Sequence, residues 1–267
     1  MFDDLKVIVR TFPKKQNVLN VYAIGDTHVG SEQFDEQTVR KKIEIIKNDP
    51  NGVVCLCGDL GDYGLRTGKC PTNPYRATMQ PQEQQEYIYE LFLPIKDKIC
   101  AAVAGNHEDR IIRETGIDPM FQLCTLWGCP EVCRENLAIT KFAFGQSANK
   151  QRQHVFIGIT SHGSTRNKHQ KFIAGFNADF SISGHTHRPE YSPHGRIAID
   201  PIHATAKLVP YKEMVVDANM KIGGYGLKKE YEILPPPELQ YFELKVVRDN
   251  TRNRTTHKII NYHTIQL

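Results

Sequence analysis

The chain has 267 residues, of which 40% are hydrophobic and 24% charged, and its formal net charge is +4. This composition excludes a disordered, collagenous or coiled-coil chain, and no apolar run approaches the roughly 20 residues of a membrane-spanning helix. Two acidic residues, Asp3 and Asp4, stand where a signal peptide carries basic ones. We therefore expect a cytoplasmic protein with no membrane association, whose mild positive charge permits anionic substrates without requiring them.

The seven cysteines are odd in number and lack the regular spacing of a disulfide framework. Cys55 and Cys57 lie in a strand-like run, so we expect them to be small core residues. Cys129 and Cys133 are close enough in sequence to form half of a zinc site, with Cys124 nearby. No second pair with CxxC spacing accompanies them, so a zinc site is the less favoured interpretation.

The first half of the chain alternates predicted strands and helices. Short apolar, β-branched runs predict strands at residues 18–24, 53–57 and 101–104. Apolar residues recur at helical spacing over 35–47 and again over 82–93, which predicts two helices with one buried face. A stretch interrupted by Gly and Pro, from 63 to 81, is predicted to be a long surface loop.

The second half of the chain has a weaker pattern. A helix is expected over 118–126. Strands are expected at residues 137–144, 155–160 and 180–183. After Pro210 the sequence predicts little until the run of three prolines at 235–237.

The end of the chain resembles a hairpin. Residues 240–247 and 256–262 are strand-like and flank a polar turn. No internal repeat or domain boundary is evident along the sequence. We therefore expect one domain over 1–267, with a C-terminal strand extension at about 239–263.

Five of the apolar strands end at short loops that carry Asp, Asn or His. In open α/β sheets, ligands bind beyond the carboxyl ends of the strands, so residues spread over about 160 positions can meet at one place. The loop residues are Asp26, His28, Asp59, Asp62, Asn106, His107, Glu108, His162, His185 and His187. Each fragment alone fits a turn with a polar side chain. Together they supply carboxylates, imidazoles and an amide oxygen, a mixture suited to borderline divalent ions.

Taken in order, these loops form five blocks: D-x-H at 26–28, G-D-x-x-D at 58–62, G-N-H-E at 105–108, a separate His162, and G-H-x-H at 184–187. The set resembles the signature of the calcineurin-like metallophosphoesterases, over about residues 18–205. The resemblance implies a four-layer α/β/β/α sandwich of two mixed sheets flanked by helices. We expect the C-terminal hairpin to extend one of these sheets, because a lone hairpin is only marginally stable in water.

The resemblance also implies two divalent metal ions per chain. One ion would be held by Asp26, His28, Asp59 and His187, and the other by Asp59, Asn106, His162 and His185. Asp59 would bridge them, since two dications about 3.5–4 Å apart need a shared anion to offset their repulsion. A hydroxide bridging the two ions would attack phosphorus. Manganese is the first choice of metal, and iron, zinc, nickel and cobalt accept the same ligands.

Two further loop residues are expected to act in catalysis. By the resemblance, His107 is not a ligand; it would donate a proton to the leaving oxygen or stabilise the charge that develops there. Asp62 resembles the family's acidic partner of that histidine, which fixes its tautomer and keeps it cationic. The alternative for Asp62 is a solvated loop carboxylate.

The signature leaves the substrate open. Protein phosphatases of this family carry Arg directly after the second Asp of G-D-x-x-D, and Tyr63 stands there instead, which argues against a phosphoprotein. Basic residues lie next to the ligand loops at Arg66, Lys69, Arg76, Arg166, Lys168 and Lys171. Tyrosines accompany the first of these segments, as stacking platforms for bases do. The candidate substrate-binding residues are Tyr63, Arg66, Arg166 and Lys168. Solvated loop charges without a partner are the alternative.

Three functions are compatible with these observations. The first is a metal-dependent phosphodiesterase or nuclease acting on nucleic acid or nucleotides, since nuclease members of the family act on DNA ends. The second is a phosphomonoesterase acting on small molecules or phosphoproteins. The third is a non-catalytic binding module with the same fold, which is disfavoured because a pure scaffold needs neither intact ligands nor His107. The oligomeric state cannot be read from the sequence.

Overall fold

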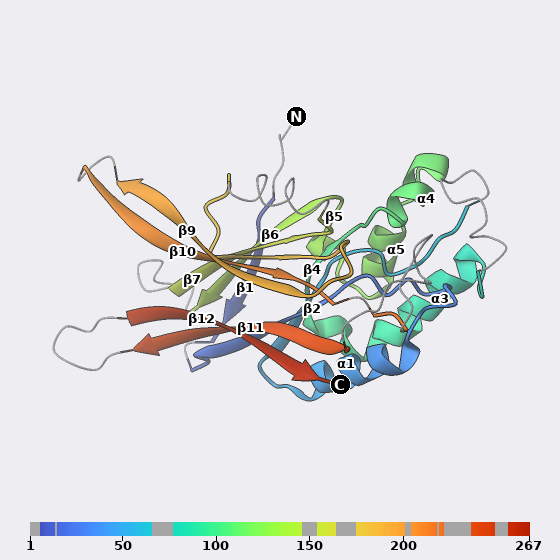
Figure 1. The fold of residues 1–267 in the computed structure, drawn as a ribbon, viewed down its shortest axis with the longest axis horizontal. Helices are drawn as coiled ribbons and strands as arrows, with labels where there is room; N and C mark the ends of the chain where they lie inside the picture. Colours follow the sequence, from blue (N-terminus) through green and yellow to red (C-terminus); the bar gives the residue numbers. More distant parts are fainter. Residues whose placement is uncertain are drawn as a thin grey trace.

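The structure is a computed structural model. It describes residues 6–13, 15–65, 77–145, 154–163, 175–200, 204–217, 219–221, 236–248 and 256–267. Two mixed sheets of six strands each, A and B, form the centre of the molecule, and Figure 1 shows the helices gathered at one end of it. This architecture confirms the predicted α/β sandwich of two mixed sheets with flanking helices.

Sheet B has the strand order β12-β11-β2-β3-β4-β5. Its strands are β2 (Val18–Ile24), β3 (Gly52–Leu56), β4 (Ile99–Val103), β5 (Cys133–Arg134), β11 (Glu238–Arg248) and β12 (Thr256–Gln266). The strands from β2 to β5 run parallel, and every residue of β3 and β4 is buried. Continuous apolar runs suit such strands, because a parallel sheet is covered on both faces. The carboxyl ends of these strands therefore meet at one edge of the sheet.

Helices pack against sheet B. The described helices are α1 (Glu36–Asn48), α3 (Pro81–Phe92), α4 (Glu108–Thr115) and α5 (Pro119–Leu126), with 3₁₀ helices η1 (Leu93–Lys98) and η2 (Pro130–Val132). Helix α1 contacts β3, and α5 contacts β4. The Asp35 side chain caps α1 by accepting the Thr38 N–H. Val39, Ile43 and Ile46 form the buried face of α1. None of the described helices has the length and apolarity to cross a membrane.

Sheet A has the strand order β1-β6-β7-β8-β10-β9. Its strands are β1 (Ile8–Phe12), β6 (Leu137–Phe144), β7 (His154–Ser161), β8 (Phe180–Ser183), β9 (Glu190–Asp200) and β10 (Thr205–Val215). The sequence pattern predicts neither β1 nor the β9–β10 pair. Pro193 and Gly195 interrupt the pattern of β9, but β9 is an edge strand, where a missing N–H donor is tolerated.

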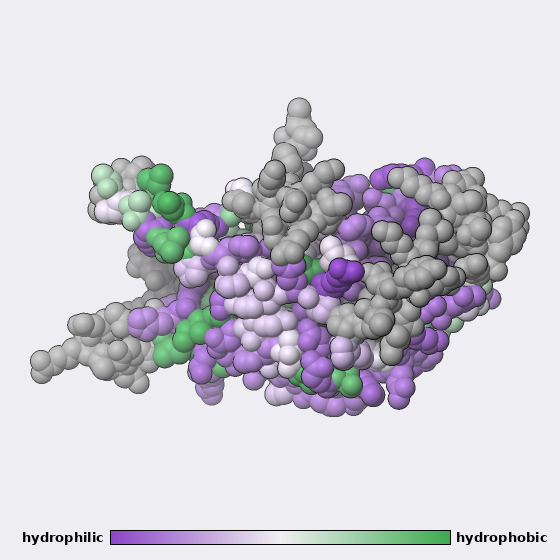
Figure 2. Space-filling model, in the orientation of Figure 1, coloured by the Kyte–Doolittle hydropathy of each residue, from purple (hydrophilic) through white to green (hydrophobic). Residues whose placement is uncertain are grey.

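Two long hairpins extend the sheets at the end of the molecule away from the helices (Figure 1). Strand β11 pairs with β2, with Tyr241 opposite Tyr22, and β12 pairs with β11. This pairing confirms that the C-terminal hairpin extends one sheet. The β9–β10 hairpin carries Ile197, Ile199 and Leu208, which are 72–75% exposed, and Figure 2 shows green, hydrophobic surface over this hairpin at the upper left. Ile197 and Leu208 are direct cross-strand partners, so their side chains share one face of the hairpin.

The core between the two sheets is aromatic. The ring of Phe180 in β8 lies 5.2 Å from that of Phe242 in β11 and 5.9 Å from that of Phe142 in β6, measured between centroids. All three rings are buried. These contacts join sheet A to sheet B, so the strand ends of one sheet are held in a fixed position relative to those of the other.

The cysteines with described surroundings are free thiols. Cys55 and Cys57 are buried in the core, as predicted, and Cys55 Sγ lies 3.5 Å from Cys100 Sγ. The groups of described side chains with the geometry to hold a metal include no cysteine, and so neither Cys129 nor Cys133. The zinc site therefore remains the less favoured interpretation of that pair.

Candidate metal centre

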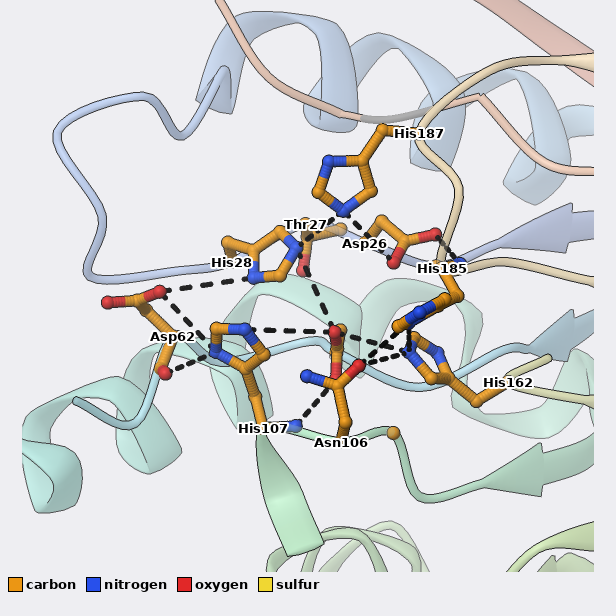
Figure 3. A network of polar contacts seen from close by, with 12 residues as sticks. Asp26, Thr27, His28, Asp62, Asn106, His107, His162, His185 and His187 are labelled. Carbon is orange, nitrogen blue, oxygen red and sulfur yellow. Dashed lines mark hydrogen bonds and ion pairs between the residues drawn. The ribbon is translucent and has the colours of Figure 1, made fainter. Parts of the chain in front are cut away.

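Loops from both sheets meet at one place. The loops after β2, β3 and β4 of sheet B and those after β7 and β8 of sheet A converge there, and Figure 3 shows their side chains pointing toward one another. The seven predicted ligands on these loops are Asp26, His28, Asp59, Asn106, His162, His185 and His187. The fold therefore brings together all of the residues from which the sequence predicts a metal site.

The first group of candidate ligands consists of Asp26, His28 and His187. His187 Nε2 lies 3.2 Å from His28 Nε2 and 3.5 Å from Asp26 Oδ1. Asp26 and His28 are fully buried, whereas the His187 side chain is 17% exposed. Asp26 Oδ1 accepts no hydrogen bond from the described residues. A buried carboxylate oxygen that faces two imidazole nitrogens fits a bound cation.

The second group consists of Asp59, His162 and His185, with Asn106 beside them. His162 Nε2 lies 3.2 Å from Asp59 Oδ2 and 3.1 Å from His185 Nδ1. Asn106 Oδ1 lies 3.0 Å from His162 Nε2 and 2.8 Å from His185 Nδ1. His162 Nδ1 donates to the carbonyl of Cys57 at 2.8 Å, which directs the Nε2 lone pair into the group.

Asp59 connects the two groups. Its Oδ2 is 3.2 Å from His162 Nε2 and 4.0 Å from His28 Nε2, while its Oδ1 accepts the His107 N–H at 2.8 Å. Burial would raise the pKa of Asp59, but His162 and His107 hold it below its ordinary value, so the carboxylate is ionised. Asp59 thus has the position and the charge that a ligand shared by two cations needs.

The backbone at the ligands adopts an uncommon conformation. Positive φ angles occur at Asp26 (50°), His28 (45°), Asp59 (51°), His185 (75°) and His187 (59°). Such angles are rare outside glycine and cluster at functional sites, where the surrounding fold enforces them. At Gly58 (φ 83°) an added Cβ would lie 2.5 Å from the Gly105 nitrogen. Only glycine there lets the loops after β3 and β4 touch.

The surroundings shift the pKa values of the histidine donors in different directions. Burial, together with His107, lowers the pKa of His28 well below its usual range, and burial with His162 lowers that of His185. Both imidazoles are therefore neutral and able to bind a metal. Burial opposes the charged form of His162 as well, but Asp59 raises its pKa to about 10. Metal binding at His162 therefore displaces a proton.

His107 and Asp62 lie beside the two groups (Figure 3). His107 Nδ1 is 2.5 Å from the Asp62 carbonyl oxygen and 3.4 Å from Asp62 Oδ1. A carbonyl only accepts, so Nδ1 carries the proton, and Nε2 faces Asp59 Oδ2 at 3.9 Å. Burial lowers the pKa of His107, so the structure favours a neutral imidazole where the sequence predicts a cationic one. His107 also forms a third group of candidate ligands with His28 and Asp59, although the resemblance assigns it no metal.

Glu108 has a structural role that its motif did not reveal. It is fully buried, and its carboxylate accepts backbone N–H groups of Asp59, Leu60 and Gly105 at 2.8–2.9 Å and that of Gly61 at 3.4 Å. Burial and the Asp59 charge raise its pKa to about 7, and the backbone donors oppose that rise. Glu108 therefore ties the loop that carries Asp59 to the loop that carries Asn106.

Replacing Glu108 by alanine is expected to destabilise the protein. The change leaves at least three buried N–H groups without an acceptor, at roughly 1–3 kcal/mol each, so we expect the free energy of unfolding to fall by at least about 3 kcal/mol. Urea denaturation of the parent and of Glu108→Ala measures this difference. Glu114→Ala, an exposed change on the same helix, is the control and should have little effect. Equal stability of Glu108→Ala and the parent would contradict the proposed role.

A segment beyond the signature holds the first ligand loop. The Asn219 side chain donates to the Gly25 carbonyl at 2.5 Å, and its backbone N–H donates to the Asp26 carbonyl at 3.2 Å. Nearby, Lys42 forms a buried ion pair with Asp217 at 3.3 Å. Burial lowers the pKa of Lys42 and raises that of Asp217. The two Asn219 hydrogen bonds act as a clamp on the loop; no sequence motif indicates this clamp, because Asn219 lies where the strand pattern is weak.

The predicted substrate-binding residues are placed only in part. Tyr63 is 1% exposed; its N–H donates to Gln84 Oε1 at 2.9 Å, and its hydroxyl donates to Gln85 Oε1 at 2.5 Å. A ring so buried offers no face to a nucleic-acid base, which argues against the predicted stacking role. Other basic and aromatic candidates lie outside the described residues: Arg66, Lys69, Tyr75, Arg76, Arg166, Lys168 and Lys171.

Comparisons with known proteins identify one family. The sequence model of the calcineurin-like phosphoesterases matches residues 19–189. No curated protein matches the chain. Similar solved structures include an archaeal phosphodiesterase (14% identity, 91% of this chain and 100% of that chain covered, TM-score 0.42) and Vps29 of Chaetomium thermophilum (10%, 93% and 98%, 0.42). Another is GAP50 of Plasmodium, described as an anchor in the inner membrane complex (12%, 91% and 89%, 0.45). These structural likenesses are too remote to assign an activity.

Proposed function

The chain belongs to the calcineurin-like phosphoesterase family, and we propose on this basis that it is a phosphoester hydrolase that uses two divalent metal ions. The observation that supports the proposal most directly is the junction of two ligand groups at Asp59, 3.2 Å from His162 and 4.0 Å from His28. Manganese is the metal we propose first, since the site mixes oxygen and nitrogen donors.

The ligand residues divide between the two ions. Bound dications supply a water that ionises at neutral pH and a clamp for the phosphate oxygens. Asp26, His28 and His187 hold one ion, and Asn106, His162 and His185 hold the other, with Asp59 common to both. The bond from His162 Nδ1 to the Cys57 carbonyl keeps that ring in the orientation that binding requires.

His107 acts at the leaving group. Its Nδ1–H donates to the Asp62 carbonyl, so Nε2 is the ring atom directed at the centre. Nε2 has to take up a proton first; the imidazolium formed in this way can then hydrogen-bond to the leaving oxygen or donate the proton to it, which neutralises the charge that develops there. Asp62 fixes the tautomer through its carbonyl and lies close enough, with Oδ1 at 3.4 Å, to stabilise the imidazolium.

Within this class, we propose a phosphodiester of nucleic acid or a nucleotide as substrate, with a phosphomonoester as the alternative. Tyr63 supports the diester, because the position after Asp62 supplies no cation for a doubly charged phosphate. The involvement of Arg66, Arg166 and Lys168 in a nucleic-acid track stays a prediction.

The test compares two aryl esters. Protein loaded with Mn²⁺ should hydrolyse bis-p-nitrophenyl phosphate faster than p-nitrophenyl phosphate, and chelation should abolish both activities. Faster hydrolysis of the monoester would contradict the diester proposal and make a phosphomonoester the expected substrate. Hydrolysis of neither ester, nor of an oligonucleotide, would contradict the enzymatic proposal and favour a binding module.

A further inference from the structure

Arg110 lies against the proposed catalytic histidine. Its Nη2 is 2.9 Å from His107 Nε2, and its Nη1 is 3.2 Å from His107 Nδ1 and 3.5 Å from the Asp62 carbonyl oxygen. The residue belongs to the first turn of α4 and is half-buried. Because Nε2 is the ring atom that faces the metal ligands, the guanidinium sits at the edge of the centre.

The Arg110 guanidinium has no carboxylate partner among the described residues; its polar contacts are with His107 and the Asp62 carbonyl. Arg113, one turn further along α4, instead pairs with Asp109 at 3.4 Å. A guanidinium keeps its proton in proteins. Among the described residues, Arg110 therefore holds a positive charge outside any direct ion pair, next to a site whose expected substrate is an anion.

The contact with His107 is one that a substrate can replace. Nη2 can only donate and His107 Nε2 can accept, so the bond at 2.9 Å occupies the lone pair that has to take up a proton before Nε2 can act at the leaving oxygen. Any phosphate oxygen in hydrogen-bond contact with His107 Nε2 is also close to Arg110 Nη2. The planar fork of a guanidinium matches two oxygens of a phosphate group, which makes arginine a strong phosphate ligand.

We infer that Arg110 binds the phosphate group of the substrate, giving up its bond to His107 as it does so. The inference rests on the proposed function, since it concerns the same site. Transfer of the guanidinium to phosphate frees His107 Nε2 to take up the proton that it then donates to the leaving oxygen.

The competing explanation is that Arg110 only orients His107. Two substitutions separate these roles. Arg110→Gln keeps an N–H donor for His107 Nε2 but removes the charge, and Arg110→Lys keeps the charge. Arg113→Gln is the matched control. It removes a guanidinium from the same helix, and the Arg113 side chain is 78% exposed and paired with Asp109.

The experiment measures binding of inorganic phosphate to Mn²⁺-loaded protein by titration calorimetry at low salt. Arg110→Gln should weaken phosphate binding by roughly 10- to 100-fold, the usual contribution of a hydrogen bond to a charged group. Arg110→Lys should retain part of the affinity, and Arg113→Gln should match the parent. Metal content and urea denaturation should be unchanged in all three variants, since Arg110 makes no contact with a predicted ligand.

Phosphate binding as tight in Arg110→Gln as in the parent would overturn the inference, and so would a parent that binds Mn²⁺ but no phosphate. A lower kcat in Arg110→Gln with unchanged phosphate affinity would assign Arg110 to the positioning of His107 instead. The proposed hydrolase activity can fail separately from this inference. If the parent binds phosphate through Arg110 but hydrolyses no ester, the role of Arg110 in phosphate binding stands and the proposed activity is refuted.

Discussion

Replacing Asp59 by alanine is expected to remove most of both metal ions and to reduce ester hydrolysis to background. Asp59 belongs to the second ligand group and lies 4.0 Å from His28 of the first, and it is the carboxylate that we propose both ions share. The loss of metal affinity should exceed the roughly 10–100-fold that removal of a ligand's outer partner causes. Elemental analysis of protein purified without chelator measures the metal content, and an aryl ester assay measures the activity.

Asp59→Asn sharpens this test. It keeps an oxygen that can accept the His107 N–H, now bonded to Asp59 Oδ1 at 2.8 Å, but it removes the negative charge between the two groups. We expect it to lose metal nearly as fully as Asp59→Ala, because the charge offsets the repulsion of the two ions. Asp97→Asn, an exposed change in η1, should keep both ions. Two ions bound as tightly in Asp59→Asn as in the parent would show that the assignment of the bridging ligand is wrong.

Replacing His107 by alanine is expected to leave the metal content intact and to lower kcat by about 10²–10⁴-fold, the usual contribution of a positioned acid or base. The predicted reason is that Nε2 acts at the leaving oxygen and binds no metal. Elemental analysis and steady-state kinetics on the same preparations test the two parts. Loss of a metal ion in His107→Ala would instead show that His107 is a metal ligand, as the geometry of its group with His28 and Asp59 allows.

The leaving group separates two forms of this catalysis. A good leaving group such as p-nitrophenolate needs no proton, so acid catalysis predicts a smaller loss for aryl esters than for alkyl esters in His107→Ala. An equal loss for both would point to stabilisation of charge on the phosphate or leaving oxygen. His257→Ala, an exposed change in β12, controls for the general effect of removing an imidazole.

The buried strands are the part of the fold that the sequence predicts best. The predicted ranges of β2, β6 and β8 coincide with those of the structure, because apolar runs bounded by polar loops are typical of strands inside a sandwich. The β9–β10 pair is not predictable in this way. The apolar residues of its outer half, Ile197, Ile199 and Leu208, are exposed, so this half is held by pairing along the hairpin rather than by burial.

The types and order of the metal ligands can be predicted from the sequence, because each ligand motif directly follows a predicted strand and these strand ends meet at one place. The contacts that position them are not. A carboxylate in Glu108 and a guanidinium in Arg110 look like surface charges of a short helix, and only the folded loop shows that one is fully buried and the other touches His107. Tyr63 is held in its buried position by hydrogen bonds to Gln84 and Gln85 of α3. These residues are 21 and 22 positions away in the sequence, so no local pattern predicts the contact.

The clamp formed by Asn219 has a consequence for the smallest unit that can be active. The family match ends at residue 189, and a fragment trimmed to it would retain every predicted metal ligand. It would lose the two hydrogen bonds that hold Gly25 and Asp26, the partner of Lys42, and the pairing of β11 with β2. Residues without any catalytic chemistry of their own therefore set the C-terminal limit for truncation, and a domain graft or a fragment for crystallisation has to extend at least through β11.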